Sequence, residues 1–154
     1  MLSPEEIAEI EHELALVPRR SGACIDALRT VQRHRGWVSD EAVKDVAEFL
    51  EMSPEEVDGV ATFYNLIFRR PVGRHVIFLC DSVSCWIMGL DPLRQELEKQ
   101  LGIGLGETTA DDRFTLLPIP CLGTCDHAPA LMVDDDLHRD VAPDQVREIL
   151  DRYE

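Results

Sequence analysis

Apolar residues within the first 70 positions recur at intervals of three and four, the spacing that places side chains on one face of an α-helix. Ser3 and Ser53 are each followed by a proline and, three residues on, by a glutamate, which is the pattern of a capping box. Gly36 is a typical helix stop. The pattern predicts four short helices packed as a small bundle, within residues 3–17, 21–36, 39–52 and 53–67.

After residue 70 the pattern changes to short, continuous apolar runs, which indicate buried β-strands, separated by helical stretches. Pro118 and Pro120 lack a backbone N–H, so the strand that holds them should be an edge strand or fray at its end. We expect residues 80–90 to form a loop and Asp91 to cap the helix that follows. The predicted order is a strand at 75–79, a helix at 92–101, strands at 113–120 and 130–136, and a helix at 142–153.

The change of pattern predicts two domains, a helical one at residues 1–70 and one of the α+β or α/β class at residues 71–154. We place the boundary in the segment RRPVGRH at 69–75. In the second domain, cysteines lie at or just beyond the C-terminal ends of two strands. Ligands in open α/β sheets are usually held at that edge, so a binding site is expected there.

The charge of the chain restricts its partners. Its 154 residues include 30 acidic and 15 basic ones, a net charge of −15. This balance argues against nucleic acid and favours docking against a basic protein face, although acidic residues also simply cover solvated helices. The sequence begins without a basic and apolar leader and has no run long enough to cross a membrane. We therefore expect a soluble, cytoplasmic protein with no direct membrane insertion.

Four of the five cysteines form two close pairs. Cys80 and Cys85 are separated by four residues, and Cys121 and Cys125 by three. In a reducing compartment such pairs are more often metal ligands or redox groups than structural disulfides, and clustered thiolates favour zinc or iron–sulfur centres. The fifth, Cys24, has apolar neighbours at helical spacing, so we expect a small buried residue there.

The spacing of the pairs favours a 2Fe–2S cluster over zinc. Structural zinc usually takes tighter C-x2-C knuckles, whereas a 2Fe–2S cluster is wider and each of its irons takes two thiolates. A structural zinc module stays open as an alternative, as does a thiol oxidoreductase, whose usual motif is C-x-x-C. Small neighbours would let backbone N–H groups approach the sulfurs and influence a reduction potential, namely Ser82, Ser84, Gly89, Gly123 and Thr124.

Several side chains near the cysteines have less decisive interpretations. Asp81 and Asp126 would lower the reduction potential of an anionic cluster, or would simply solvate their loops. His127 could replace a thiolate, as in Rieske centres, but with four cysteines present it is more typical of a neighbouring or surface residue. Trp86 is expected to cover the cluster or to enter the core. No nucleophile, base and orienting group come together in the sequence, so no catalytic residue is predicted.

Two long runs carry a resemblance to a known family. They are GVATFYNLIFRRPVGRHVIFLCDSVSC at 59–85 and GETTADDRFTLLPIPCLGTCDHAPALMVDDD at 106–136. They closely resemble the thioredoxin-like 2Fe–2S ferredoxin subunits of bacterial NADH:quinone oxidoreductase, complex I, and the likeness covers nearly the whole chain. The resemblance implies a small N-terminal helical bundle, then a thioredoxin-like domain with one 2Fe–2S cluster. The ligands that it implies are Cys80, Cys85, Cys121 and Cys125.

The resemblance also implies a function. A protein of this kind exchanges electrons with the FMN of the NADH-binding flavoprotein subunit, contacts other subunits of the peripheral arm, and has no substrate site of its own. It lies in the cytoplasm, peripheral to the inner membrane. The absence of a G-x-G-x-x-G motif after a strand agrees with this. Soluble NAD-linked formate dehydrogenases and hydrogenases share the cysteine pattern and are an alternative setting, although the extended likeness favours the respiratory enzyme.

Overall fold

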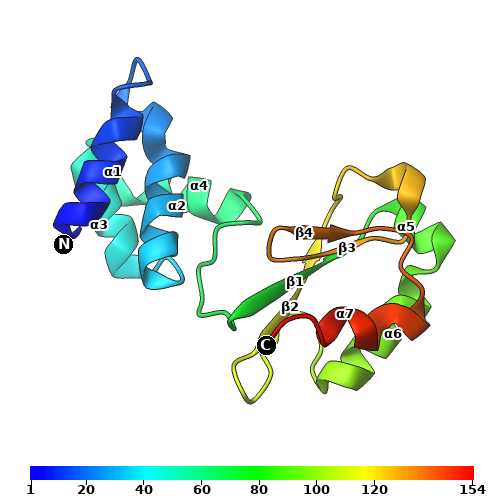
Figure 1. Ribbon diagram of the computed structural model, residues 1–154. Coiled ribbons are helices and arrows are strands. Elements are labelled where there is room, and N and C mark those ends of the chain that lie inside the picture. The colour runs from blue at the N-terminus through cyan, green and yellow to red at the C-terminus, as the bar shows by residue number, and fades with distance from the viewer. The chain divides into compact units, whose positions relative to one another are not determined.

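The computed structural model describes residues 1–154, which divide into two compact units (Figure 1). Met1–Pro71 is here called the helical unit, and Val72–Glu154 the α/β unit. Seven α-helices and one four-stranded sheet confirm the predicted fold class. No helix of the chain is both long and apolar enough to span a membrane.

The helical unit contains four α-helices where the hydrophobic pattern predicts them. Ser3 and Ser53 each accept a hydrogen bond from the backbone N–H of the glutamate three residues on, and each glutamate bonds back to the serine N–H. Both predicted capping boxes are thus confirmed, and Gly36 ends the second helix with a φ of 83°. The helices are α1 (Pro4–Leu14), α2 (Cys24–Arg35), α3 (Asp40–Leu50) and α4 (Pro54–Phe63), with a 3₁₀ turn η1 (Arg20–Ala23) before α2.

The core of the helical unit is formed by apolar faces of all four helices, with Ile10, Leu28 and Val46 fully enclosed. Cys24 lies in this core with 3 % of its surface exposed, which confirms the prediction of a buried residue. Burial raises the pKa of its thiol to about 11. Cys24 is therefore a neutral, unreactive side chain at physiological pH.

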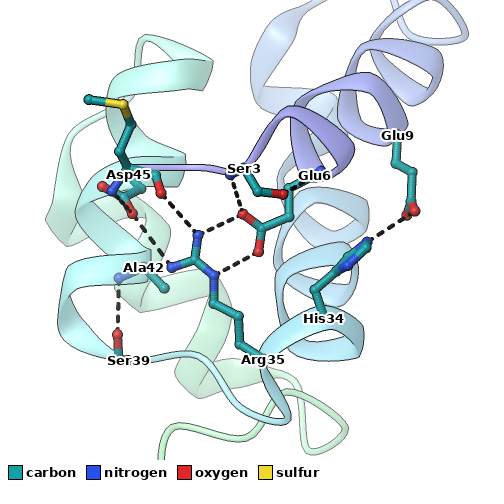
Figure 2. Close-up of polar contacts among 9 residues, drawn as sticks. Ser3, Glu6, Glu9, His34, Arg35, Ser39, Ala42 and Asp45 are labelled. Atoms are coloured by element: carbon teal, nitrogen blue, oxygen red, sulfur yellow. Dashed lines mark hydrogen bonds and ion pairs between the residues drawn. The ribbon is translucent and has the colours of Figure 1, made fainter.

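An ion pair between a buried carboxylate and a partly exposed guanidinium joins the first two helices (Figure 2). Arg35 of α2 donates two hydrogen bonds to the carboxylate of Glu6 in α1, Nε to Oε1 at 2.7 Å and Nη2 to Oε2 at 2.6 Å. The hydrogen bond from Arg35 lowers the pKa of Glu6 and outweighs burial, which raises it. Arg35 also lies 3.6 Å from Asp45 of α3, so one guanidinium links three helices.

The sheet of the α/β unit has the order β2-β1-β3-β4. β1 pairs parallel with β2 and antiparallel with β3, and β3 pairs antiparallel with β4. β2 is an edge strand, one of the two outcomes predicted from the prolines; it contains Pro118, opposite Leu79 of β1, and ends before Pro120. The strands are β1 (His75–Cys80), β2 (Phe114–Ile119), β3 (Leu131–Val133) and β4 (Asp136–His138).

Two helices pack together against the sheet in the α/β unit. Leu93 and Leu97 of α6 lie in one buried cluster with Ile77 of β1, Leu131 of β3 and Val146 of α7. This core supports the strands that carry the cysteines. The helices are α5 (Val83–Met88), α6 (Leu90–Leu101) and α7 (Val146–Leu150), and the 3₁₀ turns are η2 (Cys125–His127) and η3 (Pro143–Gln145).

The prediction of a loop at residues 80–90 is wrong. The segment contains α5, because Ser82 caps the start of this helix and Gly89, with a φ of 116°, ends it. α6 then begins directly after Gly89, so Asp91 lies in its first turn and is not its cap. The consequence for the site is that Cys85 lies on a helix.

Two predictions near the C-terminus also need correction. The single strand expected at 130–136 is a hairpin of β3 and β4, because Asp134 adopts a left-handed conformation, φ 52°, and reverses the chain. The closing helix expected at 142–153 is shorter, since Pro143 opens a 3₁₀ turn and α7 spans only Val146–Leu150.

Candidate metal centre

The first pair of cysteines lies at the end of β1 and in α5. Cys80 is the last residue of β1, and Cys85 lies in α5, whose first turn is fixed by Ser82. The Ser82 Oγ atom accepts a hydrogen bond from the Cys85 backbone N–H at 3.3 Å. Both cysteines are almost completely buried, 2 % and 1 % exposed.

The second pair follows the end of β2. Cys121 lies two residues beyond this strand, and Cys125 begins η2. Their Sγ atoms are 3.5 Å apart, and the Gly123 backbone N–H donates to Cys121 Sγ at 3.2 Å. Gly123 has a φ of 75°, a conformation that glycine adopts without strain, so the tight loop between the two cysteines depends on it. Both cysteines are exposed, and all four thiols are free.

The structure brings the two predicted pairs together. β1 and β2 are parallel neighbours, so their C-terminal ends meet at one edge of the sheet, where the Asp81 N–H donates to the Ile119 carbonyl at 2.8 Å. α5 packs against η2. The adjacent Cys121 thiol raises the pKa of Cys125, and the charge of Cys80 in the other pair raises it further. All four predicted ligands therefore lie in one region.

The two thiols of the buried pair differ in their ease of ionisation. Burial by itself raises the pKa of Cys80, but its hydrogen bonds with the Ser82 hydroxyl and with the backbone N–H groups of Ser82 and Leu122 outweigh burial, and the pKa is lowered. For Cys85, burial dominates and raises the pKa, and the charge of Cys80 adds to this effect. Cys80 is thus the thiol that the surrounding donors stabilise as a thiolate.

The arrangement of donors fits a two-iron centre better than a single ion. No group of three or more His, Cys, Asp or Glu side chains is placed to hold one metal ion, although structural zinc needs four donors around one point. The thiols form two pairs instead, one buried and one exposed, and each iron of a 2Fe–2S cluster takes two thiolates. Soft thiolates with backbone N–H donors nearby suit that group chemically.

The remaining residues singled out in the sequence lie around these pairs. His127 Nδ1 contacts Asp140 Oδ2 at 2.8 Å, and its side chain is about half exposed. Trp86 is 62 % exposed, so the interpretation as a core residue is wrong. Asp81, directly after β1, and Asp126, within η2, are exposed.

Sequence reasoning missed the part that Ser82 plays as the cap of α5. The available signal was a serine three residues before Cys85 and a glycine directly after the last helical residue, Met88. The backbone donor Leu122 carried no sequence signal, because any residue type provides an N–H there.

Comparison with known proteins places the chain in a family. A sequence model of the family described as "Thioredoxin-like [2Fe-2S] ferredoxin" matches residues 10–154. The chain therefore belongs to the thioredoxin-like 2Fe–2S ferredoxins, which carry one 2Fe–2S cluster, and the predicted resemblance is confirmed.

Two oxidoreductase subunits are similar to this chain over most of their length, and one hydrogenase chain over a part of it. The E subunit of NADH-quinone oxidoreductase from Pseudomonas aeruginosa is 54 % identical, over 99 % of this chain and 92 % of the relative. The protein of the same name from Escherichia coli strain K12 is 49 % identical with the same coverage. An NAD⁺-reducing [NiFe]-hydrogenase matches the fold with a TM-score of 0.68 and 23 % identity, covering 81 % of this chain and 22 % of that chain.

Proposed function

We propose that this chain is the electron-transfer E subunit of an NADH:quinone oxidoreductase, and that Cys80, Cys85, Cys121 and Cys125 hold its single 2Fe–2S cluster. The observation that carries the proposal is the meeting of two thiol pairs at the ends of neighbouring parallel strands. The full-length identity of 54 % to such an oxidoreductase subunit supports the respiratory setting. The likeness to the hydrogenase, at 23 % identity, supports only the fold.

The two cysteine pairs would have different roles in such a centre. The cluster, when bound, supplies reversible one-electron chemistry. The buried Cys80 and Cys85 would hold one iron away from water, and the exposed Cys121 and Cys125 would hold the other at the surface, where an electron has the shorter route to a partner. Backbone N–H groups on the sulfurs offset part of the negative charge of the centre.

We propose a division of labour between the two domains. The thioredoxin-like domain, residues 71–154, would hold the cluster, and the helical domain, residues 1–70, would contribute to docking within the complex. The division of the structure into the helical unit, which ends at Pro71, and the α/β unit, which begins at Val72, supports this boundary. Through its partners the chain would lie in the cytoplasm, peripheral to the inner membrane.

The partner that we propose for electron exchange is the NADH- and FMN-binding flavoprotein subunit, with further contacts to other peripheral-arm subunits. An apolar patch on α5 supports docking of a protein here, because clustered exposed apolar side chains on a short helix mark interaction sites. The residues of this patch lie on both sides of Cys85 in α5, and the patch lies beside the exposed pair, since α5 packs on η2. Its residues are Val83, Trp86, Ile87 and Met88, each between 61 and 71 % exposed.

Electron exchange with this partner can be measured directly. We expect NADH to bleach the visible absorbance of the chain only when the flavoprotein subunit is added.

Ile87→Glu places a charge in the apolar patch, so we expect about tenfold weaker association with the flavoprotein, measured by titration. Leu16→Glu, at an equally exposed apolar position of the helical unit, is the control and should change association less. Unchanged association of Ile87→Glu would exclude the α5 patch as the docking site.

A further inference from the structure

Ser82 occupies a special position between the two ligands of the buried pair. Its Oγ atom is 3.3 Å from the Cys85 backbone nitrogen and 3.5 Å from Cys80 Sγ. Since Ser82 is also the N-cap of α5, a single hydroxyl touches both the helix start that fixes Cys85 and the sulfur of Cys80. No other hydroxyl in the chain contacts the Cys80 sulfur.

The hydrogen-bonding capacity of a hydroxyl determines what it does here. It has one proton to donate and two lone pairs to accept with. One lone pair takes the Cys85 N–H. In the thiol form the Cys80 S–H donates to Ser82 Oγ. A thiolate ligand has no proton, so with Cys80 bound to iron the Ser82 O–H becomes the donor and Cys80 Sγ the acceptor. Cys80 is 2 % exposed, so bulk water cannot supply that donor instead.

We propose that Ser82 is a positioning residue that holds Cys80 as a thiolate ligand and raises the reduction potential of the cluster. The inference rests on the proposed function, since it takes Cys80 to be an iron ligand. The reduced cluster carries one more negative charge than the oxidised one, part of it on the sulfurs. A hydrogen bond to a ligand sulfur is therefore stronger in the reduced form and favours reduction.

The competing explanation is that Ser82 only caps α5. Two replacements separate the two effects, because both remove the hydroxyl donor but differ in how well they cap a helix. Ser82→Ala loses most of the stabilisation that the cap gives to α5, whereas Ser82→Gly loses much less of it, because glycine is itself a favourable N-cap. Ser82→Thr keeps both the donor and the cap. Ser39→Ala removes the cap of α3, where Ser39 Oγ accepts from Ala42 N at 3.2 Å, without touching the cysteines.

The experiment is a redox titration of the purified, cluster-loaded full chain and these four variants. We expect the reduction equilibrium constant to fall about tenfold in both Ser82→Ala and Ser82→Gly, a shift of about 59 mV to more negative potential for one electron. Ser82→Thr should keep the wild-type potential. Ser39→Ala should lower the unfolding temperature without changing the potential.

Other results would overturn the inference. If the reduction potential shifts in Ser82→Ala but not in Ser82→Gly, the shift follows cap stability and the hydroxyl has no role in it. A Ser82→Thr variant without the wild-type potential would also contradict a role of the hydroxyl. If neither Ser82→Ala nor Ser82→Gly retains iron, the iron content of Ser82→Thr is the test. A normal iron content supports the role of the hydroxyl, and loss of iron contradicts it. Failure of the proposed function shows itself differently, as wild-type protein without a cluster or as Cys80→Ala with an intact one.

Discussion

Cys121→Ala is expected to lose most of the iron of the protein and its visible absorbance. Cys121 is one of two thiols that would hold the surface iron, 3.5 Å from Cys125 and fixed by the Gly123 N–H. With three thiolates left, one iron has an open position and the cluster is exposed to solvent and oxygen. Because ligation energy is also folding energy, the unfolding free energy of the loaded protein should fall by more than about 3 kcal/mol.

The matched control for this prediction is Cys24→Ala. Cys24 is the one cysteine outside the two pairs, buried in the core of the helical unit. Its replacement should leave iron content and absorbance at wild-type level and lower stability by only about 1 kcal/mol, the effect of a small cavity. Iron analysis and a visible spectrum of both variants are sufficient. Iron lost from Cys24→Ala, or kept at full level in Cys121→Ala, would show that the ligands are assigned wrongly.

Glu6→Gln is expected to destabilise the helical unit by about 2 kcal/mol at pH 7. Glu6 is 1 % exposed and accepts two hydrogen bonds from Arg35 (Figure 2). Glutamine keeps the shape, and its one carbonyl oxygen can still accept from the Ser3 N–H, so the capping box survives, whereas the charge and one of the two acceptors for Arg35 are lost. The measurement is chemical unfolding followed by far-ultraviolet circular dichroism.

The effect of this substitution should depend on pH in a defined direction. The pKa of Glu6 is lowered in the folded chain by its hydrogen bonds from Arg35. A lowered pKa contributes stability above the unfolded value of about 4.3, and this contribution is lost as the pH falls through the folded value. The difference between wild type and Glu6→Gln should therefore stay constant from about pH 7 to 5 and shrink below about pH 4.

Glu9→Gln is the control for the ion pair of Glu6. Glu9 also pairs with two α2 residues, Arg33 at 2.6 Å and His34 at 3.0 Å, but its side chain is 44 % exposed. Exposed ion pairs contribute little, so the loss should be much smaller than that of Glu6→Gln. Equal losses of unfolding free energy for Glu6→Gln and Glu9→Gln would contradict the claim that burial makes the ion pair of Glu6 the more stabilising one.

Local signals made much of the fold predictable. The capping boxes at Ser3 and Ser53 and the glycine stops at Gly36 and Gly102 lie within a few residues of the helix ends that they define. The β3–β4 hairpin could not be predicted in the same way. Its turn depends on Asp134 adopting a left-handed conformation, which is uncommon for aspartate and is supported here by its carboxylate accepting from the Val76 N–H across the sheet.

The residue types of the candidate site could be predicted from the sequence, but the difference in burial between the two cysteine pairs could not. Cysteine spacing and strand ends indicated which thiols meet, because parallel neighbours place their C-terminal ends together. That Cys80 and Cys85 are buried while Cys121 and Cys125 are exposed depends on α5 folding over the first pair. Burial is set by packing of distant elements, which no short stretch of sequence encodes.

The most direct test of the shared centre is the content of iron and acid-labile sulfide in the purified chain, measured together with the visible spectrum before and after dithionite. We expect equal amounts of iron and sulfide, two of each per chain as the 2Fe–2S composition requires, and colour that fades on reduction. Colourless protein holding one equivalent of zinc and no sulfide would contradict a cluster shared by the two cysteine pairs.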